Sequence, residues 1–213
     1  MFRYLVNFFY PPKCFGCGTL LALNSEEPVC AVCLAEIKRS GSGVFDAAGC
    51  KVIYSVKYEN AAKNMIAEMK FRGGRRAAKF FALLMTDAFV SWSGGFVPDV
   101  ITFVPLHRKR ENERGFNQSE IISRNVSKIL ELPFRPMLRR IINTPSQREF
   151  DIVGRKKNVK DAFKFIDSAI KINGKKVLLV DDVATTGATL TECAKTLSSA
   201  GASEVRALVF AKT

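Results

Sequence analysis

Apolar and polar positions alternate regularly along most of this 213-residue chain, from about residue 50 onward. Short apolar runs predict β-strands over residues 52–58, 100–105, 176–180 and 204–211. Apolar positions with helical spacing predict helices over residues 61–71, 76–90, 118–130 and 189–199. Apolar strands that alternate with helices are typical of a parallel sheet covered by helices on both faces, so we expect an α/β fold.

Two parts of the chain depart from this pattern. Residues 143–160 are polar and basic without a clear period, and we expect a long mobile loop there. The chain begins with a short apolar stretch that Asn7 interrupts and two prolines follow, which does not fit a signal peptide. We expect this stretch to pack on the domain or to make a peripheral membrane contact through Phe2, Leu5, Val6, Phe8 and Phe9. No apolar run approaches the roughly 18 residues of a membrane span.

Four of the six cysteines form two pairs with two residues between the partners, Cys14 with Cys17 and Cys30 with Cys33. Each such turn directs two thiolates at one point, and two turns supply four ligands in a tetrahedron. In a chain that we expect to be cytoplasmic, this spacing favours a structural zinc ion, and two disulfides or a redox pair are the alternatives. We therefore expect an N-terminal segment with a zinc ribbon over residues 1–50 and an α/β domain over residues 51–213.

The remaining candidate ligands do not extend this metal site. Cys50 and Cys193 lack a CxxC partner, and we expect both to be small core residues. His107 is the only histidine, so it cannot build a histidine-based metal site.

Positive charge is concentrated in the middle of the chain. The formal net charge is +13, and residues 51–165 carry 23 Lys and Arg against 11 Asp and Glu. Because this excess lies within the predicted folded body and not in a tail, it indicates a basic cleft or face for an anionic partner.

The stretch from Lys176 to Leu190 carries the most specific chemistry. An apolar strand ends in Asp181 and Asp182, and a small, hydroxyl-rich turn leads into a helix. Backbone N–H groups at the start of a helix form a cradle for a phosphate monoester, and Gly187 permits close approach to the anion. The two acids suit ribose hydroxyls. A turn that merely uses Asp and Thr as caps is the alternative, and neither a Walker A motif nor a G-x-G-x-x-G loop is present.

This stretch resembles the loop of type I phosphoribosyltransferases that binds 5-phosphoribosyl 1-pyrophosphate (PRPP). The resemblance implies that Asp181 and Asp182 face the ribose hydroxyls. It also implies that the 5-phosphate is held by the residues of the turn, Ala184, Thr185, Thr186, Gly187, Ala188 and Thr189.

The segment from Val104 to Gln118 is similar to the pyrophosphate-binding loop of the same enzymes. It contains the sequence Arg114, Gly115, Phe116 and Asn117, which the resemblance places on the pyrophosphate. The alternative for the basic residues from Arg108 to Arg110 is that they form a charged surface exposed to solvent and bind no anion.

A second segment is similar to the flexible loop that closes over PRPP, and it includes Gln147, Arg148, Arg155, Lys156 and Asn158. Closure of such a loop excludes water and brings cations to the leaving group. The resemblance implies that Arg114, Arg148 and Arg155 stabilise the negative charge of the departing pyrophosphate. Lys70 and Arg72, at the end of the first predicted helix, are weaker candidates.

Together with the cysteine ribbon and the Lys70-Phe71 segment, these motifs are similar to those of the ComF/GntX competence family over nearly the whole chain. Members of that family often have a second cysteine pair after the first ribbon. This chain has only Gly49-Cys50 there, which argues against a second zinc ion.

The resemblance implies a protein of DNA uptake and natural transformation that binds PRPP, or a related sugar phosphate, with Mg²⁺. If it is a transferase, pyrophosphate leaves the C1 atom of the ribose and a nucleophile takes its place. The alternative is a non-catalytic accessory protein that binds single-stranded DNA with its basic face and zinc ribbon. The family further implies a helicase partner of the DNA-uptake machinery.

Overall fold

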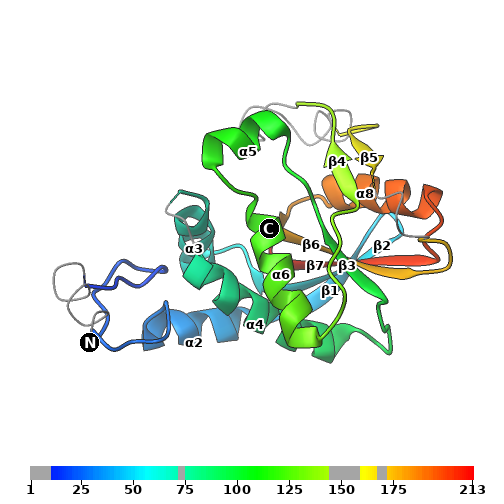
Figure 1. Cartoon of the computed structure of the whole chain (residues 1–213). Helices are drawn as coiled ribbons and strands as arrows, with labels where there is room; N and C mark the ends of the chain where they lie inside the picture. Colours follow the sequence, from blue (N-terminus) through cyan, green and yellow to red (C-terminus); the bar gives the residue numbers. More distant parts are fainter. Residues whose placement is uncertain (1–10, 72–74, 144–158, 167–171) are drawn as a thin grey trace.

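A five-stranded sheet forms the centre of the molecule in the computed structural model, which describes residues 11–71, 75–143, 159–166 and 172–213 (Figure 1). The strand order is β1-β2-β7-β6-β3. The strands are β1 (Gly43–Ala47), β2 (Cys50–Lys57), β7 (Glu204–Lys212), β6 (Lys176–Ala184) and β3 (Val100–Phe103). Four of them are parallel, whereas β1 is antiparallel to β2.

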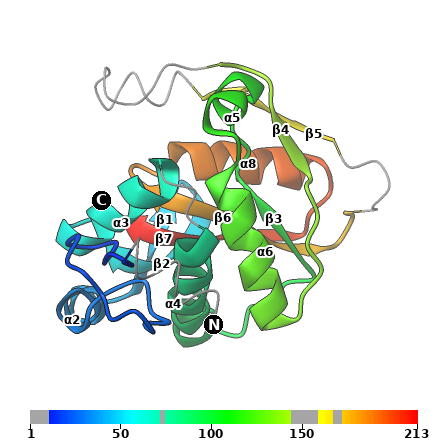
Figure 2. The ribbon, with the colours of Figure 1, turned by 60° about the vertical axis from the view of Figure 1, so that its left-hand side comes forward.

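Helices cover both faces of this sheet, which confirms the expected α/β fold (Figure 2). One face carries α3 (Asn60–Phe71), α4 (Arg75–Trp92) and α6 (Gln118–Leu130). Its core contains the parallel stack of Phe81 on Phe210, with ring centroids 3.7 Å apart. The opposite face carries α8 (Ala188–Ser199), whose buried side chains pack on β6 and β7.

The structure also contains elements that the apolar pattern did not predict. These are α2 (Ala31–Ser40), β1, α5 (Arg108–Arg114), β4 (Leu138–Arg140) and β5 (Phe163–Phe165). The strands β4 and β5 form a separate antiparallel pair, and β5 packs against α8. Most of the expected mobile loop, residues 144–158, lies outside the described residues.

The cysteine-bearing segment packs on the α/β domain through α2 and α3. Cys14 and Cys33 belong to the same apolar core as residues of α3 and α4. The side-chain amide of Asn64, on α3, donates a 2.7 Å hydrogen bond to the carbonyl oxygen of Gly16. A side chain on Gly16 would contact Cys33 and Ala61, so the segment lies close against the helix.

The structure also bears on the expectations for the two remaining cysteines and for membrane contact. Cys50 and Cys193 are buried core residues, as predicted. The apolar residues from Phe2 to Phe9 lie outside the described residues. Within the part of the chain that the structure describes, no helix has the length and apolar character needed to cross a lipid bilayer.

The strand ends bring the chemistry-bearing residues to one edge of the sheet. The strand β3 ends at Phe103, which lies opposite Val180 of β6. Because β6 continues beyond that point, Asp181 and Asp182 extend past their neighbouring strand at its carboxyl end. In open α/β sheets, ligands bind at this edge.

Candidate functional site

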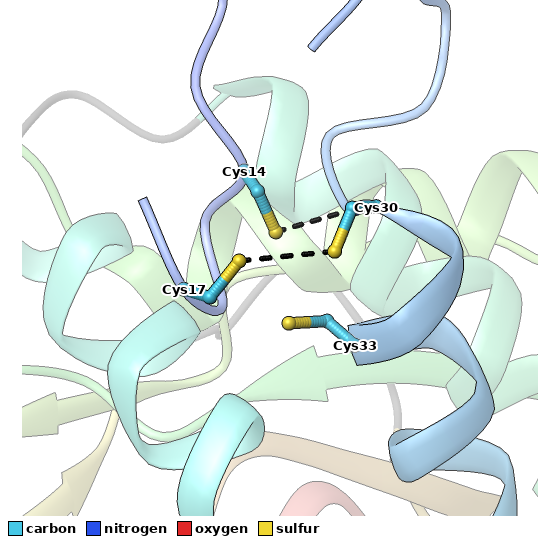
Figure 3. Close-up of side chains that lie close together, drawn as sticks. All are labelled: Cys14, Cys17, Cys30 and Cys33. Carbon is cyan, nitrogen blue, oxygen red and sulfur yellow. Dashed lines mark hydrogen bonds between the residues drawn. The ribbon is translucent and has the colours of Figure 1, made fainter. Parts of the chain in front are cut away.

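The four paired cysteines converge on one point (Figure 3). Their Sγ atoms all lie within 4.8 Å of one another, and those of Cys17 and Cys30 are 3.7 Å apart. Zinc–sulfur bonds of about 2.3 Å in a tetrahedron separate the sulfur atoms by about 3.8 Å. The backbone N–H of Cys30 donates to the Sγ of Cys14 at 3.2 Å, a hydrogen bond that orients the ligand atom.

The chemistry of this cysteine cluster also suits a metal. No disulfide joins any of the six cysteines in the structure. Hydrogen bonds with Thr19 lower the pKa of Cys17 to about 6, which favours the thiolate that binds metal. Burial instead raises the pKa of Cys33, a penalty that a bound cation removes. The four thiols can therefore hold a metal such as zinc.

Asp181 is buried at the end of β6, where two donors hold one of its oxygens. The Ser119 hydroxyl donates to Oδ1 at 2.6 Å, and the backbone N–H of Asp182 donates to the same atom at 2.9 Å. Burial and the negative charge of Asp182 nevertheless raise the pKa of Asp181 to about 7. Its other oxygen accepts no hydrogen bond from the described residues.

Asp182 is held by a cation and an amide. Its Oδ2 atom lies 2.9 Å from Lys70 Nζ and accepts a 3.2 Å hydrogen bond from Gln118 Nε2. Burial works to raise the pKa of Asp182, but the charge and the hydrogen bond of Lys70 outweigh it and lower that pKa. Arg114 extends the network, because its guanidinium donates to Gln118 Oε1 at 3.1 Å.

The turn after Asp182 has the form of an anion cradle. Gly187 is the N-cap residue of α8 and adopts φ = 77°, and the Thr186 hydroxyl accepts the N–H of Ala188 at 3.4 Å. A Cβ at Gly187 would collide with Ala47, so both the backbone conformation and the close packing require glycine. Beyond Ala188, the amides of the first helical turn are available to an anion.

Two adjoining cavities connect these features. The cradle borders a cavity of about 30 Å³, lined by Val159, Asp181 and residues 183–190. A larger cavity of about 590 Å³ shares Asp181, Val183, Thr185 and Thr189 with it. The described cations that line the larger cavity are Lys70, Arg110, Arg114 and Arg140, whereas no described Lys or Arg lines the smaller one.

The positive charges of the larger cavity lie close enough to influence one another. Burial and the neighbouring Arg110 lower the pKa of the Arg140 guanidinium. Arg140 also lies over the ring of Phe163, with its Cζ atom 5.5 Å from the ring centroid. An anionic group inside this cavity would reduce the repulsion between the two guanidiniums.

The sequence-predicted site residues fall into three groups. Asp181, Asp182, the turn from Ala184 to Thr189, and Arg114 line the cavities. Gly115, Phe116 and Asn117 form the junction between α5 and α6 and do not line them, although Asn117 caps α6 by accepting the N–H groups of Ser119 and Glu120. Arg148, Arg155 and the other residues of the predicted closing loop lie outside the described residues, as does Arg72.

Three residues of the network were missed or underrated. Gln118 and Ser119 begin α6, where an Asn-Gln-Ser sequence reads as a helix cap and gives no sign of contact with a distant carboxylate. From the sequence, Lys70 is only a weaker candidate for the binding site, because nothing in the local sequence indicates that it pairs with a residue 112 positions later. A basic residue in the last turn of a helix is common for electrostatic reasons alone.

The site has relatives among known proteins. Residues 117–213 match the family described as the phosphoribosyl transferase domain. The chain is 29% identical over 200 residues to Competence protein F of Haemophilus influenzae. The aligned region covers 92% of this chain and 82% of that protein. It is also 29% identical over 167 residues to DNA utilization protein YhgH of Escherichia coli strain K12, and that aligned region covers 76% of this chain and 72% of the relative.

A solved structure with a similar arrangement is the adenine phosphoribosyltransferase from Thermoanaerobacter pseudethanolicus. The superposed region covers 84% of this chain and 99% of that enzyme's chain, with 16% sequence identity and a TM-score of 0.43.

Proposed function

Because this chain belongs to the ComF family of phosphoribosyltransferase-like proteins, we propose that it binds PRPP with Mg²⁺ in the two adjoining cavities and acts in DNA uptake. The names of its relatives, Competence protein F and DNA utilization protein, support the role in DNA uptake. A zinc ion in the cysteine cluster completes the proposal.

One observation carries the ligand assignment. An amide cradle without described cations lines the smaller cavity, and four described cations line the larger one. The buried carboxylates lie between them, because Asp181 lines both cavities and Asp182 lines the larger one. PRPP matches this division, because its 5-phosphate, its ribose hydroxyls and its pyrophosphate follow one another along the molecule. The single phosphate fits the amides, the hydroxyls fit the acids, and the more highly charged pyrophosphate fits the cations.

Each group of residues has a defined task in this proposal. Amides of the turn from Ala184 to Thr189 hold the 5-phosphate in the smaller cavity, and Asp181 and Asp182, which line the larger one, accept hydrogen bonds from the ribose. Arg114 stabilises the charge that develops on the pyrophosphate, together with Arg148 and Arg155 of the proposed closing loop. Where an acceptor is present, the bond from C1 to the pyrophosphate oxygen breaks and its electron pair leaves with pyrophosphate. A lone pair of the acceptor then forms the new bond to C1.

The residues present also fit Mg²⁺. This ion prefers oxygen ligands and keeps several waters, so a few carboxylate and phosphate oxygens suffice to hold it. Asp181 and Asp182 are the carboxylates that line the cavity. When bound, Mg²⁺ supplies positive charge to the ribose and pyrophosphate oxygens.

Calorimetric titration with PRPP and Mg²⁺ tests the assignment. The double variant Asp181→Asn, Asp182→Asn removes two charged hydrogen-bond acceptors, and we expect its PRPP affinity to fall about a hundredfold or more. The zinc content should remain that of the wild type, because the cysteine cluster is separate from these residues.

A charge-matched control separates recognition from general electrostatics. The double variant Asp87→Asn, Glu131→Gln changes two exposed acids outside the cavities and should bind PRPP like the wild type. Equal affinity of the wild type and the Asp181, Asp182 variant would contradict the ribose assignment.

A second candidate function is the binding of single-stranded DNA, and the β4–β5 pair favours it. Arg139 and Lys164 lie directly opposite each other on this pair, and both are exposed. Like charges in that position destabilise a sheet, so an anion between them is expected to stabilise it. A groove of about 750 Å³ between β5 and α8 is lined by Lys160, Lys164 and Lys195, with two acids, Asp161 and Glu192.

A further inference from the structure

Lys70 forms an ion pair with Asp182, one of the two carboxylates of the site. It extends from the last turn of α3 into the 590 Å³ cavity, and its Nζ atom lies 2.9 Å from Asp182 Oδ2. The Lys70 side chain is 25% exposed and that of Asp182 9%, so the pair is largely withdrawn from water. In this position an ammonium group needs a counter-charge.

A ligand that uses Asp182 competes with this pair. The Oδ2 atom of Asp182 already accepts from both Lys70 and Gln118. A ribose hydroxyl that donates to Asp182 draws on the same negative charge and weakens its hold on Lys70. Gln118 is neutral and has a second partner in Arg114, so it tolerates the exchange better than Lys70 does.

The surroundings of Lys70 decide what can replace Asp182. Arg114 is close enough to repel the ammonium, and Arg110 and Arg140 line the same cavity. A ligand with a second anionic group in this cavity therefore offers Lys70 a new counter-charge. A ligand whose only phosphate sits in the cradle offers none, because Lys70 does not line that smaller cavity.

We propose that Lys70 is a specificity-determining residue, which exchanges Asp182 for the pyrophosphate of the ligand and so makes the site select PRPP over ribose 5-phosphate. The inference rests on the proposed function and goes beyond it, because it assigns the discrimination to one side chain on α3. A ligand that brings the ribose and the 5-phosphate without the pyrophosphate binds more weakly, because it leaves Lys70 without a counter-charge.

Calorimetric titration of PRPP and of ribose 5-phosphate, both with Mg²⁺, tests this assignment. In Lys70→Gln the amide can still donate to Asp182, so the fold should be kept while the charge is lost. We expect PRPP to bind about tenfold more weakly than to the wild type, whereas ribose 5-phosphate binds as well or better. The ratio of the two affinities therefore falls.

Three further variants complete the design. Lys70→Arg keeps the charge and should retain most of the selectivity, and Lys70→Met is a second neutral variant, so the result does not depend on one side chain. Lys63→Gln removes an exposed lysine from the same helix and should leave both affinities unchanged.

The outcomes distinguish the two levels of the proposal. If both neutral variants weaken the two ligands equally, or weaken neither, Lys70 does not determine specificity, although the PRPP site stands. If the wild type binds neither ligand, the proposed function itself is wrong, and the role of Lys70 is overturned with it.

Discussion

Asp181 and Asp182 adjoin in the chain, but the protein moves their pKa values in opposite directions. Burial and the charge of its neighbour raise the pKa of Asp181 to about 7. Lys70 and Gln118 overcome the burial of Asp182 and lower its pKa. The carboxylate of Asp182 is thus held ionised by its partners, whereas that of Asp181 titrates near neutral pH because its environment disfavours the charge.

The raised pKa of Asp181 predicts a pH-dependent cost to the fold. Between about pH 4, where an unfolded Asp titrates, and about pH 7, the folded state binds more protons, so its stability falls as pH rises. Asp181→Asn removes this cost. We expect its gain in free energy of unfolding over the wild type to increase by about 2–3 kcal/mol from pH 5 to pH 8, measured by urea denaturation without ligand.

Asp182→Asn provides the contrasting measurement. It leaves Lys70 without its counter-charge, so we expect the variant to be less stable than the wild type at both pH values. A constant difference between Asp181→Asn and the wild type across this pH range would contradict the assignment for Asp181.

Residues whose roles depend on local sequence could be predicted, and those whose roles depend on distant contacts could not. The cysteine spacing and the Asp-Asp-turn-helix sequence are local patterns, and the structure brings each group together. Lys70, Gln118 and Ser119 contact carboxylates that lie 62 or more positions away, so only the fold reveals them.

At the level of elements, apolar period and caps identified the long helices well. The helix predicted over residues 118–130 is α6, Gln118–Leu130, whose start is fixed by the Asn117 side chain. The seven residues of α5 contain no apolar side chain, so their period gave no signal. That helix instead depends on His107, which accepts the N–H of Lys109, and on Gly115, which ends it in a left-handed conformation.

The β4–β5 pair yields a prediction about DNA. If a DNA backbone lies across Arg139 and Lys164, the double variant Arg139→Gln, Lys164→Gln should bind an oligothymidylate more weakly. The slope of log affinity against log salt should also become shallower, by about 1.4 for two phosphate contacts. Fluorescence anisotropy over a salt series measures both quantities.

Its control removes the same charge elsewhere. Lys79→Gln with Lys128→Gln alters exposed residues of α4 and α6, on the other face of the sheet, and should keep the wild-type slope. Equal losses in the two double variants would mean that net charge, and not the β4–β5 pair, attracts DNA.

For the whole molecule, the positive charge has a partial explanation. Lys70, Arg110, Arg114 and Arg140 gather at one cavity, which accounts for part of the excess that residues 51–165 carry. The cysteine segment is likewise part of the folded body, because Cys14 and Cys33 share a core with α3 and α4. Sequence spacing predicted the cluster, but the packing against α3 depends on tertiary contacts.

Removal of the metal should therefore lower the stability of the whole fold as well as that of the cysteine cluster. Without a cation, no metal–sulfur bonds link the four cysteine side chains, and the segment loses its packing on α3. We expect chelation to lower the melting temperature by about 5 °C or more, and added zinc to restore it. The exposed Cys17, changed to Ser, should reproduce the loss without removing core volume. An unchanged melting temperature after verified metal loss would contradict a structural role.

The packing of the cysteine segment on α3 also joins two equilibria. Ala61 of this helix borders Gly16, and Lys70, about 14 Å further along the helix axis, holds Asp182. Any factor by which the metal strengthens PRPP binding through this helix must equal the factor by which PRPP strengthens metal binding. If that factor exceeds one, the cysteine cluster holds its metal more tightly when PRPP is bound.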